Sequence, residues 1–284
     1  MTNTKSEMVK IIIVYAIELA IMIGSSVVFS TVGANIPFVV QAIVIYALLV
    51  APVIIYSIKD GNFTAESFGF KKIKVSTIFL TVLLTLVCSP MCIFVNLLSQ
   101  LVVPNIVIQS FDEMMDGSMV GLFIIMAVLA PICEEIICRG FFQNRLSKLL
   151  PFLASAVVSG FMFGLLHLNL NQFCYALVLG IILAYVNKAS GSVFTSMLMH
   201  ILFNAGNVAI IALGSMALAA QDIDMAELAE NTRTDKTVML AGIIFYGVLA
   251  VISFFLTRLV IKAIAKREGT YIIEEEFVNA PMES

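Results

Sequence analysis

The sequence predicts an all-α protein, a polytopic bundle of transmembrane helices, and three observations carry this prediction. Hydrophobic residues make up 61% of the 284 residues, whereas about 45–50% is usual for soluble domains. Charged residues make up only 12%. The apolar residues fall into runs of roughly 20, the length that crosses the hydrocarbon core of a bilayer as a helix. We therefore expect an integral, multi-pass membrane protein.

About eight apolar segments are candidates for membrane spans. The first follows the N-terminal MTNTKSEMVK directly, and because no small-residue cleavage site comes after it, we expect a helix and not a removed signal peptide. The sixth is short, so we expect it to be tilted, kinked at Gly180 or shielded by its neighbours. In chain order, the predicted spans are 11–31, 36–57, 76–103, 119–146, 152–168, 173–187, 192–213 and 238–262.

Polar segments join these spans. Residues 58–74 read as an interfacial loop, and the polar loop 221–237 is suited to a surface helix. The end of the chain, about 268–284, is predicted to be a mobile polar tail. Because no repeat and no soluble domain is visible, residues 1–284 are expected to form a single integral membrane domain.

The basic residues predict the orientation of the bundle. If the N-terminus is cytoplasmic, every lysine and arginine except Arg233 and Lys236 falls on the inner side or on an inner helix end. The outer loop 104–118 carries three acidic residues and no basic one. Since cytoplasmic loops carry an excess of lysine and arginine, we predict that both termini are cytoplasmic.

Composition also bears on partners. The net charge of −3 excludes a nucleic-acid partner, because such binding needs a concentrated basic patch. The five cysteines lie in or beside apolar segments, which argues against a disulfide framework, and no CxxC pair is present. The lipid bilayer is the expected surrounding, and the sequence does not indicate an oligomeric state.

The stretch CEEIICRG, residues 133–140, places three charges inside an apolar run. A charge near the bilayer centre costs at least ~2.5–3.5 kcal/mol on insertion scales. On a helix, Glu135 and Arg139 are four positions apart with the acid first, the favourable order for an ion pair. Glu134 lies about 140° around the helix from Arg139. Glu134 therefore needs another polar partner.

The two histidines of the chain, His167 and His200, are the candidate partners, because both fall in predicted spans. Glu134 and His167 are each about 16 residues, or ~24 Å of helix, from the predicted turn near Leu150–Pro151. Asn204 is one helical turn beyond His200. We therefore predict one buried polar cluster, and ionisable residues inside a membrane are functional by default. Small residues spaced by four, Ala156, Gly160 and Gly164, favour close helix packing beside it.

Three motifs now carry a resemblance to a known family. EEIICR (134–139) resembles the EExxxR motif of the CAAX protease and bacteriocin-processing family, also called the CPBP or Abi family. FGLLH (163–167) resembles its FxxxH motif, and HILFN (200–204) its HxxxN motif. ESFGFKK (66–72) looks like the interfacial segment that often precedes the core of the family. The resemblance covers residues 119–213, the motif-bearing core.

The resemblance implies a metal-independent, glutamate-type intramembrane endopeptidase without a cofactor. Glu134 matches the catalytic glutamate and His167 its partner in activating water. His200 and Asn204 match the oxyanion stabilisers. The supporting positions are Glu135, Arg139 and Phe163. The implied partner is a membrane-associated peptide or protein, and the expected location is a bacterial cell membrane; the substrate, its cleavage site and any lipidation stay open.

Several alternatives stay open at this point. A zinc-dependent membrane peptidase could use Glu134, His167 and His200 as ligands, although HExxH is absent. A thiol protease would use Cys133 or Cys138, but a thiol in an apolar helix is usually inert. A proton-coupled transporter also buries ionisable residues, yet no matching pair of broken helices is visible. The last alternative is a non-catalytic membrane regulator or bacteriocin immunity protein of the same fold.

Overall fold

A computed structural model describes residues 2–32, 36–114 and 118–270. Within these ranges the regular elements are all helices, so the all-α prediction is confirmed. In chain order they are α1 (Thr2–Val32), α2 (Phe38–Lys59), α3 (Val75–Gln100), α4 (Ile106–Gln109), α5 (Phe111–Met114), α6 (Met119–Ile124), η2 (Ile125–Leu129), α7 (Ala130–Glu135), η3 (Ile136–Gln143), α8 (Asn144–Leu146), α9 (Phe152–Leu165), α10 (Leu170–Ser190), α11 (Val193–Ala219), α12 (Met225–Thr234) and α13 (Lys236–Glu268). Most of the predicted tail lies outside the described residues.

Seven described helices, one fewer than expected, are long and apolar enough to cross a membrane, and the protein is a multi-pass membrane protein. The helix that falls short is α9, which has 14 residues and spans about 21 Å, against a hydrocarbon core of about 30 Å. The prediction of a short sixth span is wrong, because α10 has 21 residues. Its first turn is polar, and Asn169 caps it by accepting a hydrogen bond from the amide of Gln172.

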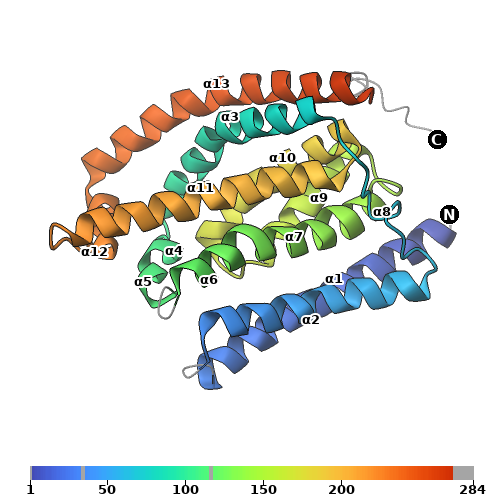
Figure 1. Cartoon of the computed structure of the whole chain (residues 1–284), viewed down its shortest axis with the longest axis horizontal. Helices are drawn as coiled ribbons and strands as arrows, with labels where there is room; N and C mark the ends of the chain where they lie inside the picture. The colour runs from blue at the N-terminus through green and yellow to red at the C-terminus, as the bar shows by residue number, and fades with distance from the viewer. Residues whose placement is uncertain (1, 33–35, 115–117, 271–284) are drawn as a thin grey trace.

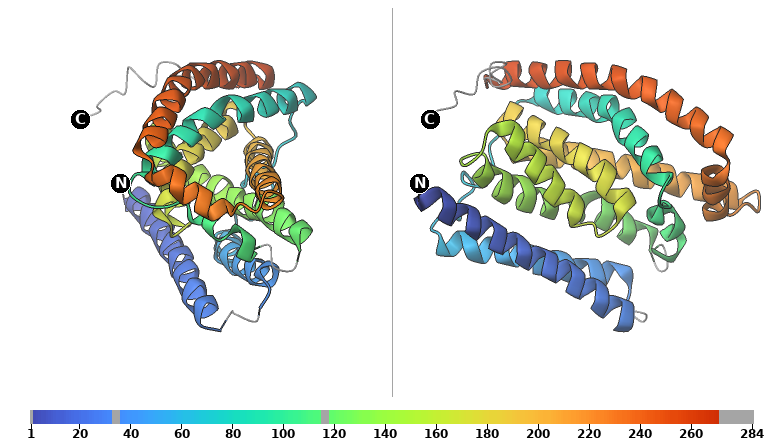
Figure 2. Two further views of the ribbon diagram at one scale, coloured as in Figure 1. Left: turned by 90° about the vertical axis from the view of Figure 1, so that its left-hand side faces the viewer. Right: turned by 180° about the vertical axis from the view of Figure 1, so that it is seen from behind.

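The helices form three groups in space (Figure 1). The α1–α2 hairpin lies along one side of the molecule, and α3 packs against α13 on the other (Figure 2). Between them α10 packs against α3, α9, α11 and α13. The start of α1 and the end of α13 lie at the same end of the bundle. This agrees with termini on one side of the membrane, while the cytoplasmic orientation stays a prediction.

Helices α9 and α10 approach each other closely through glycine. A Cβ on Gly180 would lie 2.8 Å from the Cα of Gly160, and one on Gly164 would lie 2.8 Å from the ring of Phe173. Both separations are too short for a real side chain, so only glycine fits. The small residues of α9 therefore act as predicted, by letting two membrane helices pack backbone to backbone.

Residues Met119–Leu146 form one long helix, which we call the glutamate helix because it carries Glu134 and Glu135. Two stretches of it, η2 and η3, are π-helical and flank the short α-helical turn that ends at Glu135. Pro131 lies at the start of that turn and has no N–H to donate, which weakens α-helical pairing upstream. The sequence pattern predicted an ordinary helix here, and π-turns occur frequently at functional sites.

Candidate active site

The glutamate helix holds a fully buried ion pair. Nη1 of Arg139 lies 2.9 Å from Oε1 of Glu135, and both side chains are inaccessible. Nη2 of Arg139 donates a 2.8 Å hydrogen bond to the carbonyl of Gly180 on α10. The guanidinium also lies 4.8 Å from the centre of the Phe163 ring. The predicted contact between Glu135 and Arg139 is therefore present. Through Gly180 and Phe163, Arg139 also connects the glutamate helix to α10 and α9.

His200, on α11, lies between the two glutamates. Its Nδ1 is 3.1 Å from Oε1 of Glu135, and its Nε2 is 3.6 Å from Oε2 of Glu134. The imidazole is almost completely buried. Because a carboxylate only accepts hydrogen bonds, Nδ1 donates to Glu135, and this bond fixes the ring plane. One histidine thus connects the paired glutamate to the neighbouring one.

Glu134 is the more accessible of the two acids. Its side chain is 16% exposed, whereas that of Glu135 is fully buried. The second oxygen of Glu134 accepts a 2.7 Å hydrogen bond from the hydroxyl of Tyr46 on α2. No cation other than the imidazole of His200 pairs with Glu134 among the described residues. Tyr46 was missed by the sequence reasoning, because nothing in the apolar run of α2 distinguishes this tyrosine from a packing residue.

His167 is placed differently from the prediction. It lies in the turn after α9, where Nδ1 is 2.9 Å from the carbonyl oxygen of Phe163. In the described part of the chain, no hydrogen bond or ion pair joins His167 to Glu134. Because a carbonyl only accepts, a neutral His167 donates from Nδ1 and presents the lone pair of Nε2. The direct contact between Glu134 and His167 that we expected is therefore absent from this structure.

Phe163 lies between the two histidines. Its ring makes edge contacts with His167 at 4.9 Å and with His200 at 5.4 Å between ring centres. The phenylalanine of the FGLLH motif thus packs both imidazoles and the Arg139 guanidinium around one buried ring. An aromatic residue four positions before the histidine thus places one ring against both imidazoles.

Asn204 is one turn further along α11. Its amide nitrogen donates a 3.0 Å hydrogen bond to the carbonyl of Met126, in the π-helical η2. The structure therefore brings Glu134, Glu135, Arg139 and His200 into direct contact. His167 joins this cluster through Phe163, and Asn204 joins it through the backbone of the glutamate helix.

The zinc alternative requires Glu134, His167 and His200 to converge on one point. Over the described residues, no group of three or more His, Cys, Asp or Glu side chains is arranged to hold a metal ion. Nδ1 of His167 is used in the hydrogen bond to the Phe163 carbonyl. The residues present therefore do not form a three-ligand site in this conformation.

Comparison with known families supports the motifs. The model of the family described as Type II CAAX prenyl endopeptidase Rce1-like matches residues 116–206, about a third of the chain. This segment contains all three motifs, so the resemblance inferred from them is confirmed, and protease activity is the property of that family. Comparisons with curated proteins and with solved structures found no match.

Proposed function

We propose that this protein is an intramembrane endopeptidase that hydrolyses a peptide bond of a membrane-associated protein or peptide. The observation that carries the proposal is the contrast between two adjacent acids. Glu135 is neutralised by Arg139 and shielded from solvent, while Glu134 is partly accessible and faces His200. Glu135 therefore suits a structural role, and Glu134 suits proton transfer. The match to a CAAX prenyl endopeptidase-like family supports the same assignment.

In the proposed reaction, Glu134 removes a proton from water as the oxygen attacks the scissile carbonyl carbon. Breakdown of the tetrahedral intermediate breaks the C–N bond, and Glu134 returns the proton to the leaving amine. The open lone pair of a neutral His167 is suited to accept a hydrogen bond from the same water. Tyr46 holds one oxygen of Glu134, which leaves the other toward His200.

The developing oxyanion needs hydrogen-bond donors, and removing one such donor typically costs about 10²–10³ in rate. When His200 is protonated, Nδ1 donates to Glu135, and the Nε2–H, which lies 3.6 Å from Oε2 of Glu134, is proposed to donate to the oxyanion when substrate is bound. The Asn204 amide is the second donor in the proposal, and it has one N–H beyond the bond to Met126. Glu135 and Arg139 act indirectly, by fixing the orientation of His200.

The substrate is proposed to be a peptide or protein segment at the membrane, because the site lies about halfway along a long apolar helix. We further propose a CAAX-type specificity, which the family match supports. We also propose that the reaction needs no metal or cofactor and that the protein lies in a bacterial cell membrane. No feature of the described residues identifies the cleaved sequence.

Comparison of membrane proteomes tests the proposal. Membranes that contain the wild-type protein should accumulate shortened forms of one or a few proteins, and membranes with Glu134→Gln should not. Processing in isolated membranes should continue in the presence of strong chelators. Loss of processing on chelation, with recovery on adding zinc, would favour the zinc alternative. A Glu134→Gln variant with full biological effect would instead favour a non-catalytic regulator.

A further inference from the structure

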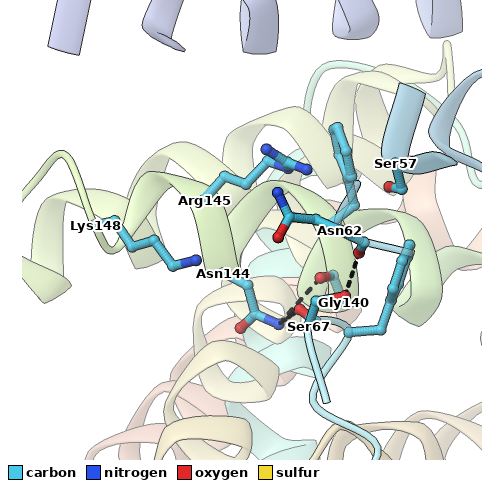
Figure 3. A pocket seen from close by; sticks show the side chains of 9 residues that line it. Ser57, Asn62, Ser67, Gly140, Asn144, Arg145 and Lys148 are labelled. Carbon is cyan, nitrogen blue, oxygen red and sulfur yellow. Dashed lines mark hydrogen bonds between the residues drawn. The ribbon is translucent and has the colours of Figure 1, made fainter. Parts of the chain in front are cut away.

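A polar hollow lies at one end of the bundle, away from the glutamates. It is formed by the last turn of α2, the loop after it, and the final turns of the glutamate helix, and its cavity volume is about 40 Å³ (Figure 3). The polar side chains that line it are Ser57, Asn62, Ser67, Asn144, Arg145 and Lys148. The hollow therefore combines two cations with several hydrogen-bonding groups where two membrane spans end.

Arg145 is held firmly in the wall of this hollow. Its Nη2 forms a 2.9 Å ion pair with Asp60. Its guanidinium also lies 4.9 Å from the ring centre of Tyr56 and 4.7 Å from that of Phe141. Because three partners fix the guanidinium, its remaining N–H groups are already oriented before any ligand binds.

Two further donors in the hollow are not used by the protein. The hydroxyl of Ser57 is buried and has no hydrogen-bond partner among the described residues. Lys148 is exposed and forms no ion pair in the part of the chain that the structure describes. By contrast, the amide nitrogens of Asn62 and Asn144 already donate to Asp60 and to the Gly140 carbonyl. The free donors thus belong to the ammonium group of Lys148, the fixed guanidinium of Arg145 and the buried hydroxyl of Ser57.

The position of the hollow indicates which anion would meet these donors. Ser57 lies two residues before the end of α2, and Arg145 one residue before the end of the glutamate helix. The ends of transmembrane helices lie at the level of the lipid headgroups. Lys59 at the end of α2, and Lys71 and Lys72 in the segment that follows it, add positive charge at this level. Basic pockets at this depth attract anionic headgroups.

We propose that this hollow binds the phosphate of an anionic phospholipid headgroup, with Lys148, Arg145 and the Ser57 hydroxyl as its donors. The lipid would sit between the loop Asp60–Ser67 and the end of the glutamate helix. Phe68 packs against Gly140 beside it, since a Cβ on Gly140 would lie 3.0 Å from the Phe68 ring. This inference does not depend on the proposed peptidase activity.

Native mass spectrometry of the full-length protein in detergent tests the inference. Phosphatidylglycerol is titrated against wild type, Lys148→Gln and Ser57→Ala, with phosphatidylcholine of the same chain length as the lipid control. Lys72→Gln is the matched protein control, because it removes the same charge at the same end but outside the hollow. We expect Lys148→Gln to weaken binding of the tightest phosphatidylglycerol about fivefold. Ser57→Ala should weaken it as well, while Lys72→Gln should change it less than twofold.

Three outcomes would overturn the inference. Equal losses in Lys148→Gln and Lys72→Gln would show diffuse attraction without a site. Equal affinity for phosphatidylcholine would show that no anionic headgroup is selected. A third titration, with inorganic phosphate, distinguishes a lipid headgroup from a free phosphate ion. If millimolar phosphate displaces the lipid completely and binds alone as tightly, the hollow is an ion site and not a lipid site.

Discussion

The Tyr46 hydroxyl donates a 2.7 Å hydrogen bond to Oε1 of Glu134, although the two residues are 88 positions apart in the sequence. Tyr46 belongs to α2, outside the segment that matches the family. The bond ties the α1–α2 hairpin to the candidate catalytic acid. It also determines which oxygen of Glu134 faces His200.

Removing this bond should reduce turnover without unfolding the protein. A hydrogen bond to a charged group is worth about 1.5–3 kcal/mol, so Tyr46→Phe should lower kcat by roughly tenfold to a hundredfold, with KM nearly unchanged. Cleavage kinetics on a processed substrate, followed together with thermal unfolding, would measure both effects. A matched control is Tyr246→Phe, on α13, far along the chain from this site. An unchanged kcat in Tyr46→Phe would exclude a positioning role for this tyrosine.

Glu134→Gln should abolish turnover and leave the fold intact. The amide keeps the shape of the side chain and can still pair with Tyr46, but it cannot accept a proton from water. General-base catalysis typically contributes about 10²–10⁴ in rate, so cleavage should fall by at least that factor while the melting temperature stays close to wild type. Marked destabilisation of Glu134→Gln would show that the roles of the two acids are assigned the wrong way round.

Glu135→Gln should destabilise the protein. Removing one partner of a buried pair typically costs about 3–5 kcal/mol, and Arg139 and His200 would both lose their carboxylate. Arg139→Gln should behave similarly, and the double variant should recover part of the loss. Melting temperature and yield of the three variants in one detergent would measure this. Strictly additive losses would argue against a coupled pair.

Gly180→Ala, on α10, should disrupt the site by displacing Arg139. The new methyl group would meet the Cα of Gly160 at 2.8 Å and Nη2 of Arg139 at 3.1 Å. Overpacking of this kind typically costs about 1–3 kcal/mol, and cleavage should fall because Arg139 is displaced. Gly206→Ala in α11 is the control, since a Cβ there meets nothing within 4 Å. It should be neutral or slightly stabilising, and equal losses in both variants would contradict the packing argument.

Replacement of Glu18 by leucine is expected to raise the stability of the protein, unlike the replacements above. This residue of α1 is completely buried, and both of its carboxyl oxygens lack a hydrogen-bond partner among the described residues. An unsatisfied buried polar group typically costs about 1–3 kcal/mol. Glu18→Leu should therefore raise the melting temperature, whereas Glu18→Gln should not. Loss of cleavage in a stabilised Glu18→Leu variant would instead reveal a functional carboxyl in α1.

The sequence predicted those features of the fold and site that depend on spacing along one helix or on composition. The four-residue separation of Glu135 and Arg139 was sufficient for their contact. The direction of His167 was not predictable, because it depends on where α9 ends and on the Phe163 carbonyl. Tyr46 could not be found from spacing either, since its position relative to Glu134 depends on packing between α2 and the glutamate helix. The length of α10 was underestimated because its polar first turn lowers the hydropathy of a true helix.

π-helical turns lie on both sides of Glu134 and Glu135, so the effect of deleting one residue from the glutamate helix depends on where the deletion falls. A hydrogen bond in a π-turn spans five residues where an α-turn spans four, so the π-turn holds one residue more. Loss of one residue from η3 would let the remainder close into an ordinary α-helix. Because the extra residue is absorbed within the π-turn, the residues beyond it would keep close to their present faces of the helix. A codon-sized deletion in η3 is therefore expected to disturb the site less than one in the α-helical turn Ala130–Glu135, where every residue beyond the deletion would turn by about 100°.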